Sequence, residues 1–145
     1  MMAYWIEAIG MSIELQPEFL ERVEKAYYMW FTTVRADGMP QPTPVWFVWE
    51  NGTCLIYTTD QSQKHRNLLA NPHVALSYSA TPDADDYLVI MGEAAVDPTA
   101  PPPNHHAPYL TKYGTGIPEI GMTPESFAQT FSVAIRVTPT HIRLE

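Results

Sequence analysis

The chain contains 145 residues, of which 46% are hydrophobic and 17% are charged, and this predicts one globular domain rather than two. Eight lysines and arginines against sixteen aspartates and glutamates give a formal net charge of -8. Such a charge repels nucleic-acid phosphate and anionic lipid, so we expect neither nucleic acid nor a membrane as a partner.

The first half of the chain predicts one helix followed by three antiparallel strands. We assign residues 1–11 to an N-terminal extension and residues 12–145 to the domain, because the first organised pattern follows Met11. A proline in the first turn and apolar side chains at helical spacing predict an amphipathic helix over residues 18–27. Runs of β-branched and aromatic residues predict strands over residues 30–35, 41–49 and 54–59, and Asn51-Gly52 predicts the hairpin turn between the last two.

The second half adds three strands and short helices. Ser62 can cap a helix over residues 62–71, which Asn71-Pro72 would stop. Similar patterns predict strands over residues 73–78, 87–96 and 133–137 and short helices over residues 109–113 and 124–131. Six strands with only short helices predict a mainly β fold, a closed antiparallel β-barrel.

Two predicted strand segments lack the alternation of apolar and polar residues that is typical of a strand with one solvent-exposed face. Residues 45–49 and 88–91 are apolar at consecutive positions, so something must cover the outer face of the sheet. In so short a chain we expect the cover to be a second copy of the protein in a two-fold dimer.

Two basic residues stand at the wrong end of the predicted helix 62–71. Lys64 and Arg66 fall in its first turn or so, where the helix already carries partial positive charge. A bound phosphate would relieve both residues. The alternative is a Ser62 cap with two solvated basic side chains.

Prolines interrupt the predicted strand 41–49. Pro42 and Pro44 cannot donate to a ladder on the side they share, so this strand is broken or lies at an opening. Its free side could offer the N–H groups of Thr43 or Val45 to a planar heteroaromatic ligand. The alternative is a plain edge strand protected by prolines.

These segments together resemble a known family. The motifs are Pro-x-Pro-Val-Trp-Phe at residues 42–47, Ile-Tyr-Thr at 56–58, Ser-x-Lys-x-x-x-Leu at 62–68 and Asn-Pro-His-Val-Ala-Leu at 71–76. They resemble the pyridoxamine 5′-phosphate oxidase-like split-barrel superfamily. Segments 107–114, 121–127 and 133–140 are similar to its deazaflavin-dependent branch, and the likeness covers Ser12 to Leu144.

The resemblance implies a homodimeric, six-stranded FMN-binding split barrel with one flavin-like cofactor per protomer at the dimer interface. It places Ser62 and Lys64 at the cofactor phosphate and Tyr57 and Thr58 beside the ribityl chain. The remaining cofactor-binding residues that we expect are Thr43, Pro44, Val45 and Trp46 along the ring, with Gln41, Arg66 and Asn67.

One position departs from the family pattern. Members that use FMN commonly carry Arg between this Ser and Lys, whereas this chain has Gln63. Arg66 or Arg35 could replace that cation, and the change favours the 5-deazaflavin coenzyme F420 over FMN. A polyglutamate tail on F420 would also need a locally basic patch, for which Lys112 and Arg136 are candidates.

The function that the resemblance implies is hydride transfer between F420 and a small conjugated molecule such as a quinone, enone or tetrapyrrole. Trp46, Tyr57 and Tyr78 are candidates for the substrate pocket, although such aromatic residues are often core or dimer-interface residues. No catalytic acid is assigned. The alternatives are an FMN-dependent oxidase or reductase and a non-catalytic flavin- or haem-binding protein.

The rest of the sequence predicts a cytoplasmic protein without a metal site. Cys54 is the single cysteine, so no intrachain disulfide or cysteine zinc cluster can form. His105-His106 lies in a proline-rich loop without an acidic residue at helical spacing. No segment approaches the ~20 apolar residues that cross a bilayer, and no secretory signal pattern precedes the domain.

Overall fold

The structure, a computed structural model, describes residues 5–7 and 17–144. Its strands are β1 (Trp5–Glu7), β2 (Met29–Val34), β3 (Pro40–Val45), β4 (Val48–Glu50), β5 (Thr53–Thr58), β6 (His73–Ser79), β7 (Tyr87–Val96) and β8 (Val133–Leu144). Its helices are α1 (Pro17–Lys25), α2 (Gln63–Ala70), α3 (Ala107–Tyr113), α4 (Gly116–Glu119), α5 (Pro124–Thr130) and the short 3-10 helix η2 (Pro103–His105). In this described part of the chain, no helix is long and apolar enough to span a membrane.

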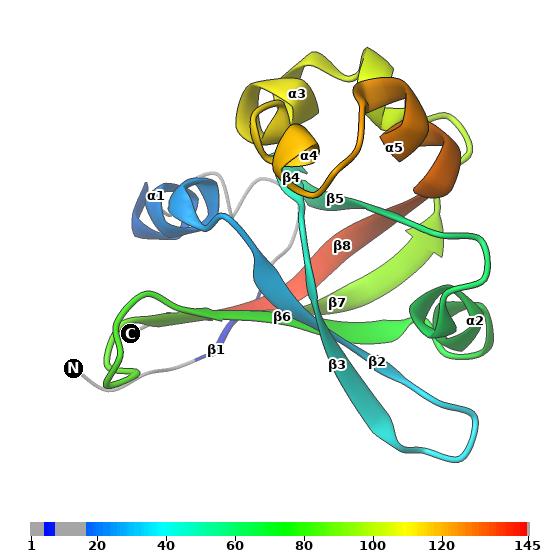
Figure 1. Cartoon of the computed structure of the whole chain (residues 1–145). Coiled ribbons are helices and arrows are strands. Elements are labelled where there is room, and N and C mark those ends of the chain that lie inside the picture. The colour runs from blue at the N-terminus through cyan, green and yellow to red at the C-terminus, as the bar shows by residue number, and fades with distance from the viewer. Residues whose placement is uncertain (1–4, 8–16, 145) are drawn as a thin grey trace.

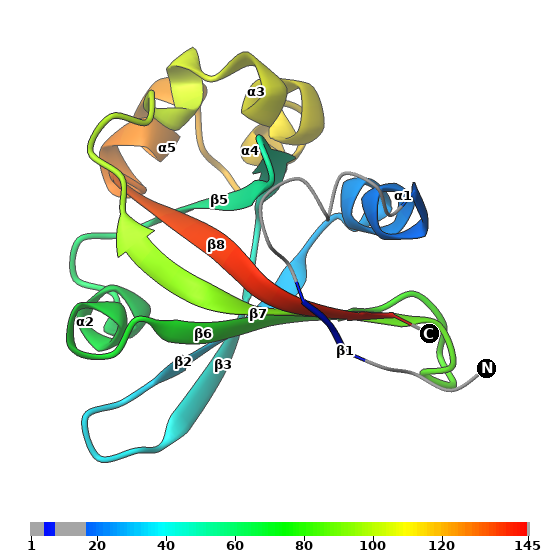
Figure 2. The same cartoon turned by 180° about the vertical axis from the view of Figure 1, so that it is seen from behind.

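All the described strands form one strongly curled antiparallel sheet (Figures 1 and 2). The strand order is β3-β2-β6-β7-β8-β5-β4, and β1 pairs with β8. The mainly β barrel with short helices is therefore confirmed. Seven strands rather than six follow this path, and residues 5–7 of the predicted extension add an edge strand.

The predicted strand 41–49 is divided in two. Its first part, β3, pairs with β2, and its second part, β4, pairs with β5 at the opposite end of the strand order. Trp46 and Phe47 thus carry the chain from one end of the sheet to the other. The described strands show no ladder between β3 and β4, so the barrel is split at this point instead of closed.

The last strand is longer than the predicted 133–137, because β8 continues to Leu144. The register of β7 against β8 shifts between Met91 and Gly92, where Gly92 faces Pro139. A proline is tolerated at such an irregularity because its missing N–H is not needed there. The proline therefore marks a bulge and does not end the strand.

Two apolar layers explain the consecutive apolar residues of β4 and β5. Phe47, Cys54 and Ile56 point into the core of the barrel, whereas Val48 and Leu55 pack beneath helices α3–α5. Figure 1 shows these three helices, which we call the helical cap, over one end of the sheet. The cover of this segment comes from the same chain, so residues 45–49 need no second copy to bury them.

The hairpin between β4 and β5 follows its sequence signal. Asn51 and Gly52 both adopt positive φ, 52° and 74°. This is the left-handed pair that a type I′ turn requires and that matches the twist of the flanking strands. The turn fixes the register in which Trp49 faces Cys54.

Candidate functional site

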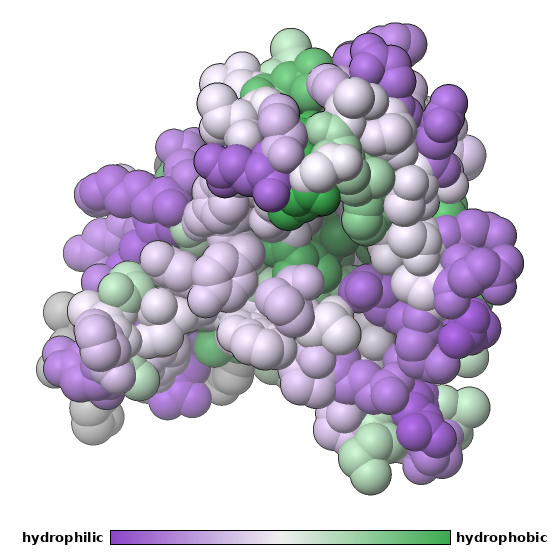
Figure 3. All heavy atoms as spheres, in the orientation of Figure 1, coloured by the Kyte–Doolittle hydropathy of each residue, from purple (hydrophilic) through white to green (hydrophobic). Residues whose placement is uncertain are grey.

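Two adjoining hollows lie between β3, α2 and the helical cap. The apolar cavity has a volume of about 190 Å³ and is lined by Pro44, Val45, Trp46, Tyr57, Thr58, Lys64, Tyr109, Ile120, Phe127 and Phe131. The hairpin groove has a volume of about 360 Å³ and is lined by Thr33, Met39, Pro40, Gln41, Pro42, Thr43, Gln63 and Lys64. Figure 3 shows apolar surface in a hollow below the cap helices on this face. Lys64 lines both hollows.

Helix α2 is held in place by its own polar residues. Ser62 caps it, because its Oγ accepts a hydrogen bond from the backbone N–H of His65 at 3.1 Å. The buried Asn67 donates from Nδ2 to Thr33 Oγ1 at 3.0 Å and to Gln41 Oε1 at 2.9 Å. These bonds fasten α2 to the β2–β3 hairpin and so fix the position of Lys64.

Lys64 is a half-buried cation without a protein partner. Among the described residues its Nζ makes no hydrogen bond or ion pair, and burial lowers its pKa from the ordinary value. Thr43 Oγ1 on the groove wall is also buried and has no partner within the described structure. Polar groups in such positions are normally satisfied, so the accessible Lys64 ammonium fits an anionic group of a ligand, whereas Thr43 Oγ1 lies beneath the groove surface.

The free edge of β3 differs from the expectation. Residues 40, 42 and 44 are prolines without N–H groups, so the ladder donors of β3 toward β2 can come only from Gln41, Thr43 and Val45. The expected N–H groups of Thr43 and Val45 therefore face β2 and not a ligand. The open edge carries carbonyl oxygens alone, which suits N–H donors of a ligand and prevents pairing with another strand.

The β5 wall of the cavity is formed by Tyr57 and Thr58. The Tyr57 hydroxyl donates a hydrogen bond to the carbonyl oxygen of Pro101, and burial raises the pKa of Tyr57 to about 12. Its ring packs edge-on against Tyr109 at a centroid distance of 4.9 Å. Tyr57 therefore contributes an apolar ring to the cavity, while its hydroxyl holds the loop before the cap.

Aromatic side chains of the cap form the opposite wall. Trp46 stacks on Tyr113 with ring centroids 4.6 Å apart and planes at 5°, and lies 5.8 Å from Phe127. Sequence reasoning missed the cap residues of the cavity, which are Tyr109, Ile120, Phe127 and Phe131. Their apolar or aromatic character was visible in the sequence, but no pattern placed residues 109–131 opposite β3.

The predicted site residues do not all reach the hollows. Arg66 is exposed and donates to the Gln61 carbonyl at 2.7 Å and to Gln63 Oε1 at 2.9 Å. Arg35 pairs with Asp37 at 2.9 Å on the surface. Tyr78 lines a separate hollow beside α1.

The other predicted residues meet at this site. Thr43, Pro44, Val45, Trp46, Tyr57, Thr58, Lys64 and Gln41 line the two hollows, Asn67 fastens α2 behind them, and Ser62 caps α2. We exclude Arg66 and Tyr78 from the site proposed below.

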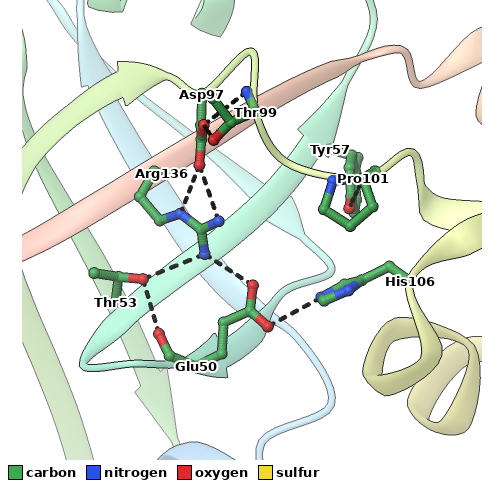
Figure 4. Close-up of polar contacts among 8 residues, drawn as sticks. All are labelled: Glu50, Thr53, Tyr57, Asp97, Thr99, Pro101, His106 and Arg136. Atoms are coloured by element: carbon green, nitrogen blue, oxygen red, sulfur yellow. Dashed lines mark hydrogen bonds and ion pairs between the residues drawn. The ribbon is translucent and has the colours of Figure 1, made fainter.

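Arg136 joins three segments around the loop that leads to the cap (Figure 4). Its guanidinium contacts Glu50 at 2.9 Å and Asp97 at 3.0 Å, and His106 Nε2 lies 3.1 Å from the same Glu50 carboxylate. Hydrogen bonds from Thr99 and Arg136 hold the pKa of Asp97 below its ordinary value. Arg136 is thus engaged internally and does not form the expected basic patch.

Lys112 is also engaged inside the protein. Its Nζ donates to the Phe47 carbonyl at 3.0 Å and lies 3.7 Å from the centroid of the Phe47 ring. Burial lowers its pKa to about 8. Lys64 is therefore the one cation among the residues that line the two hollows.

The buried Lys112 predicts a pH-dependent stability. Between pH 8 and the ordinary pKa of 10.5 the unfolded chain binds more protons at this residue, so its contribution to stability rises with pH. We expect the free energy of unfolding of the wild type, minus that of Lys112→Met, to increase over this window in urea titrations. The nearby Cys54 is common to both proteins and cancels in the difference. The exposed Lys25→Met should show no such increase, and a flat difference for Lys112→Met would contradict the prediction.

Comparison with known proteins identifies the family. Residues 15–145 match the family model described as pyridoxamine 5′-phosphate oxidase. The chain belongs to the pyridoxamine 5′-phosphate oxidase family. No curated protein matches its sequence. Solved structures that are similar to this chain have the same split-barrel fold.

Three solved structures show the range of proteins that share this fold. One described as an F420 reductase is 31% identical, covers 86% of this chain and 94% of its own, and has a TM-score of 0.65. A conserved hypothetical protein from Mycobacterium tuberculosis is 20% identical, with coverages of 90% and 84% and a TM-score of 0.73. A haem storage protein from Vibrio cholerae is 17% identical, with coverages of 86% and 89% and a TM-score of 0.61.

Proposed function

We propose that this member of the family is an oxidoreductase that transfers a hydride between coenzyme F420 and a small, flat conjugated acceptor. The observation that carries the proposal is Lys64, a half-buried cation that has no partner in the described part of the chain and lies between a polar groove and an apolar cavity. A ligand with a phosphate and a ring would satisfy both sides. The 31% identity to an F420 reductase supports the deazaflavin over other ring cofactors.

In this proposal each hollow has its own task. Lys64 and the hairpin groove hold the phosphate and the polar chain, and Pro44, Val45 and Trp46 border the ring. A bound reduced deazaflavin supplies two electrons and a hydrogen nucleus as one hydride. An acceptor would take up this hydride together with one proton from solvent, and would thereby be reduced by two electrons. The aromatic walls position the ring that enters the apolar cavity.

FMN is the second candidate, because it carries the same kind of phosphate and ring. Gln63 favours F420 here, since it forms a hydrogen bond to Asn67 Oδ1 at 2.8 Å and adds no charge beside Lys64. Haem is less well supported by the site. The residues that line the two hollows include no histidine or cysteine, which are common axial ligands of haem iron.

We propose that the protein acts as a homodimer. A third hollow of about 360 Å³ is lined by Tyr28, Trp30, Pro44, Val45 and Trp46, and three of these residues also line the apolar cavity. Tyr28 and Trp30 are 45% and 46% exposed, which is costly for large aromatic rings in an isolated protomer. A second copy seated there would border the ligand at Pro44 to Trp46.

Titration of the purified protein with F420 and with FMN tests the proposed function. We expect saturable F420 binding, measured by the fluorescence of the coenzyme, at a lower Kd than for FMN. We also expect catalysed oxidation of reduced F420 when menadione is added. Tighter binding of FMN would favour the flavin alternative, and binding of F420 without turnover would indicate a carrier protein.

A further inference from the structure

Two residues in the lining of the apolar cavity are exposed, Pro44 on the side of β3 and Ile120 on the side of the helical cap. Ile120 is 51% exposed, whereas Tyr109, Phe127, Tyr57 and Val45 in the same lining are at most 8% exposed. An apolar residue that is half in solvent and half in a cavity wall stands at the mouth of that cavity. Phe127 and its neighbours instead form the buried interior.

The end of α4 fixes where Ile120 stands. Gly121 adopts a φ of 80°, its N–H donates to the Pro118 carbonyl at 2.9 Å, and the N–H of Met122 donates to the Ile117 carbonyl at 3.2 Å. These two bonds with a left-handed residue form a Schellman motif, which ends a helix in a defined geometry. No atom would lie within 4 Å of a Cβ on Gly121, so the glycine serves the turn and not close packing. Ile120 is therefore held at the mouth by a rigid turn.

The cavity has the size and character for one flat ring system. A closed apolar cavity of about 150 Å³ takes benzene, and this open one measures about 190 Å³. Apart from Lys64 the lining carries no charged side chain, so the part of a ligand that packs against these apolar walls is expected to be uncharged. Small changes of volume at such a wall alter which ring fits.

We infer that Ile120 determines the size of the conjugated ring that the cavity admits. This inference rests on the proposed function, in which the ring belongs either to the cofactor or to the hydride acceptor. The chemistry is the same in both cases, an uncharged planar π-system. Ile120 acts by steric exclusion at the mouth and is a specificity-determining residue that takes no part in the hydride step.

The test compares Ile120→Ala, Ile120→Trp and the control Met91→Ala. Met91 is 43% exposed on β7 and is not among the residues that line the cavity. The probes are menadione with two rings, 9,10-phenanthrenequinone with three rings, and FMN. Each Kd is measured by quenching of tryptophan fluorescence, because Trp46 lines the cavity, with no deazaflavin present.

We expect Ile120→Ala to shift the ratio of the two quinone Kd values about 10-fold toward the larger quinone. Ile120→Trp should shift the ratio in the opposite direction, and Met91→Ala should leave it unchanged. If Ile120→Trp instead weakens only FMN, the cavity admits the cofactor ring, and the inference still holds. Unchanged Kd values for all three probes in both Ile120 variants, or no quenching in the wild type, would overturn it.

These outcomes are separate from those of the proposed function. Quinone binding without deazaflavin does not require hydride transfer, so a protein that fails to bind F420 can still show the shifted ratio. Conversely, a protein that oxidises reduced F420 with unchanged quinone selectivity keeps the proposed function and loses the role of Ile120.

Discussion

Gly92→Ala is expected to lower the free energy of unfolding by about 3 kcal/mol, a cost typical of severe overpacking. A Cβ on Gly92 would lie 2.3 Å from the carbonyl oxygen of Thr138 and 3.0 Å from the Cα of Pro139. Both atoms are backbone atoms of β8, so no rotation of a side chain can relieve the clash. The bulge between β7 and β8 would have to separate.

Gly38→Ala is the matched control for this prediction. Gly38 lies in the turn between β2 and β3 with a φ of 87°, and no atom would come within 4 Å of its Cβ. Only the left-handed backbone then opposes alanine, at about 1 kcal/mol. Urea denaturation of both variants measures the difference. Equal losses of stability at the two sites would show that the close approach of β8 at Gly92 is not decisive.

Lys64→Ala is expected to weaken binding of F420 by about 1.5–3 kcal/mol, or roughly 10- to 150-fold in Kd. The reason is the loss of a charge-assisted hydrogen bond to the phosphate. Lys64 has no partner among residues 5–7 and 17–144 to leave unsatisfied, so the free energy of unfolding of the unliganded protein should not fall. Fluorescence titration gives the first quantity and urea denaturation the second.

Lys25→Ala provides the control for charge alone. Lys25 is exposed on α1 and pairs with Glu21, so its removal changes the net charge by the same amount at a distance from the hollows. Its Kd for F420 should stay close to that of the wild type. If Lys64→Ala binds F420 as tightly as Lys25→Ala does, Lys64 has no role at the phosphate.

Most of the strands could be predicted because their signals are local. Asn51-Gly52 favours the positive φ angles of a hairpin turn through its own residue types. The alternation of apolar and other residues in 73–78 indicates a strand with one buried face. The start of α2 was likewise predictable, since Ser62 needs only its own helix to act as a cap. The proline-interrupted strand was correctly placed at an edge for the same reason.

The rest of the site depends on tertiary contacts. From the sequence, Lys64 and Arg66 were both expected to bind the phosphate. Two residues along a helix differ in direction by about 200° around its axis. Lys64 therefore faces the hollows, whereas Arg66 faces solvent. The prolines indicated that the predicted strand 41–49 is broken or lies at an opening, but nothing local placed the division at Trp46 and Phe47, because the segments on both sides have strand propensity. The cap wall with Ile120 and Phe127 lies about 75 residues from β3 in the chain, beyond the reach of any periodicity.

The position of β8 in the strand order has a consequence for biosynthesis. β8 pairs with β7 on one side and with β5 on the other, and it comprises the 12 residues Val133–Leu144. During translation, β3-β2-β6-β7 can pair as one unit and β4-β5 as another, but no strand ladder joins the two units until β8 leaves the ribosome. Until β8 is synthesised, the nascent protein therefore exposes the unpaired edges of β7 and β5, and chaperone protection would matter most at that stage.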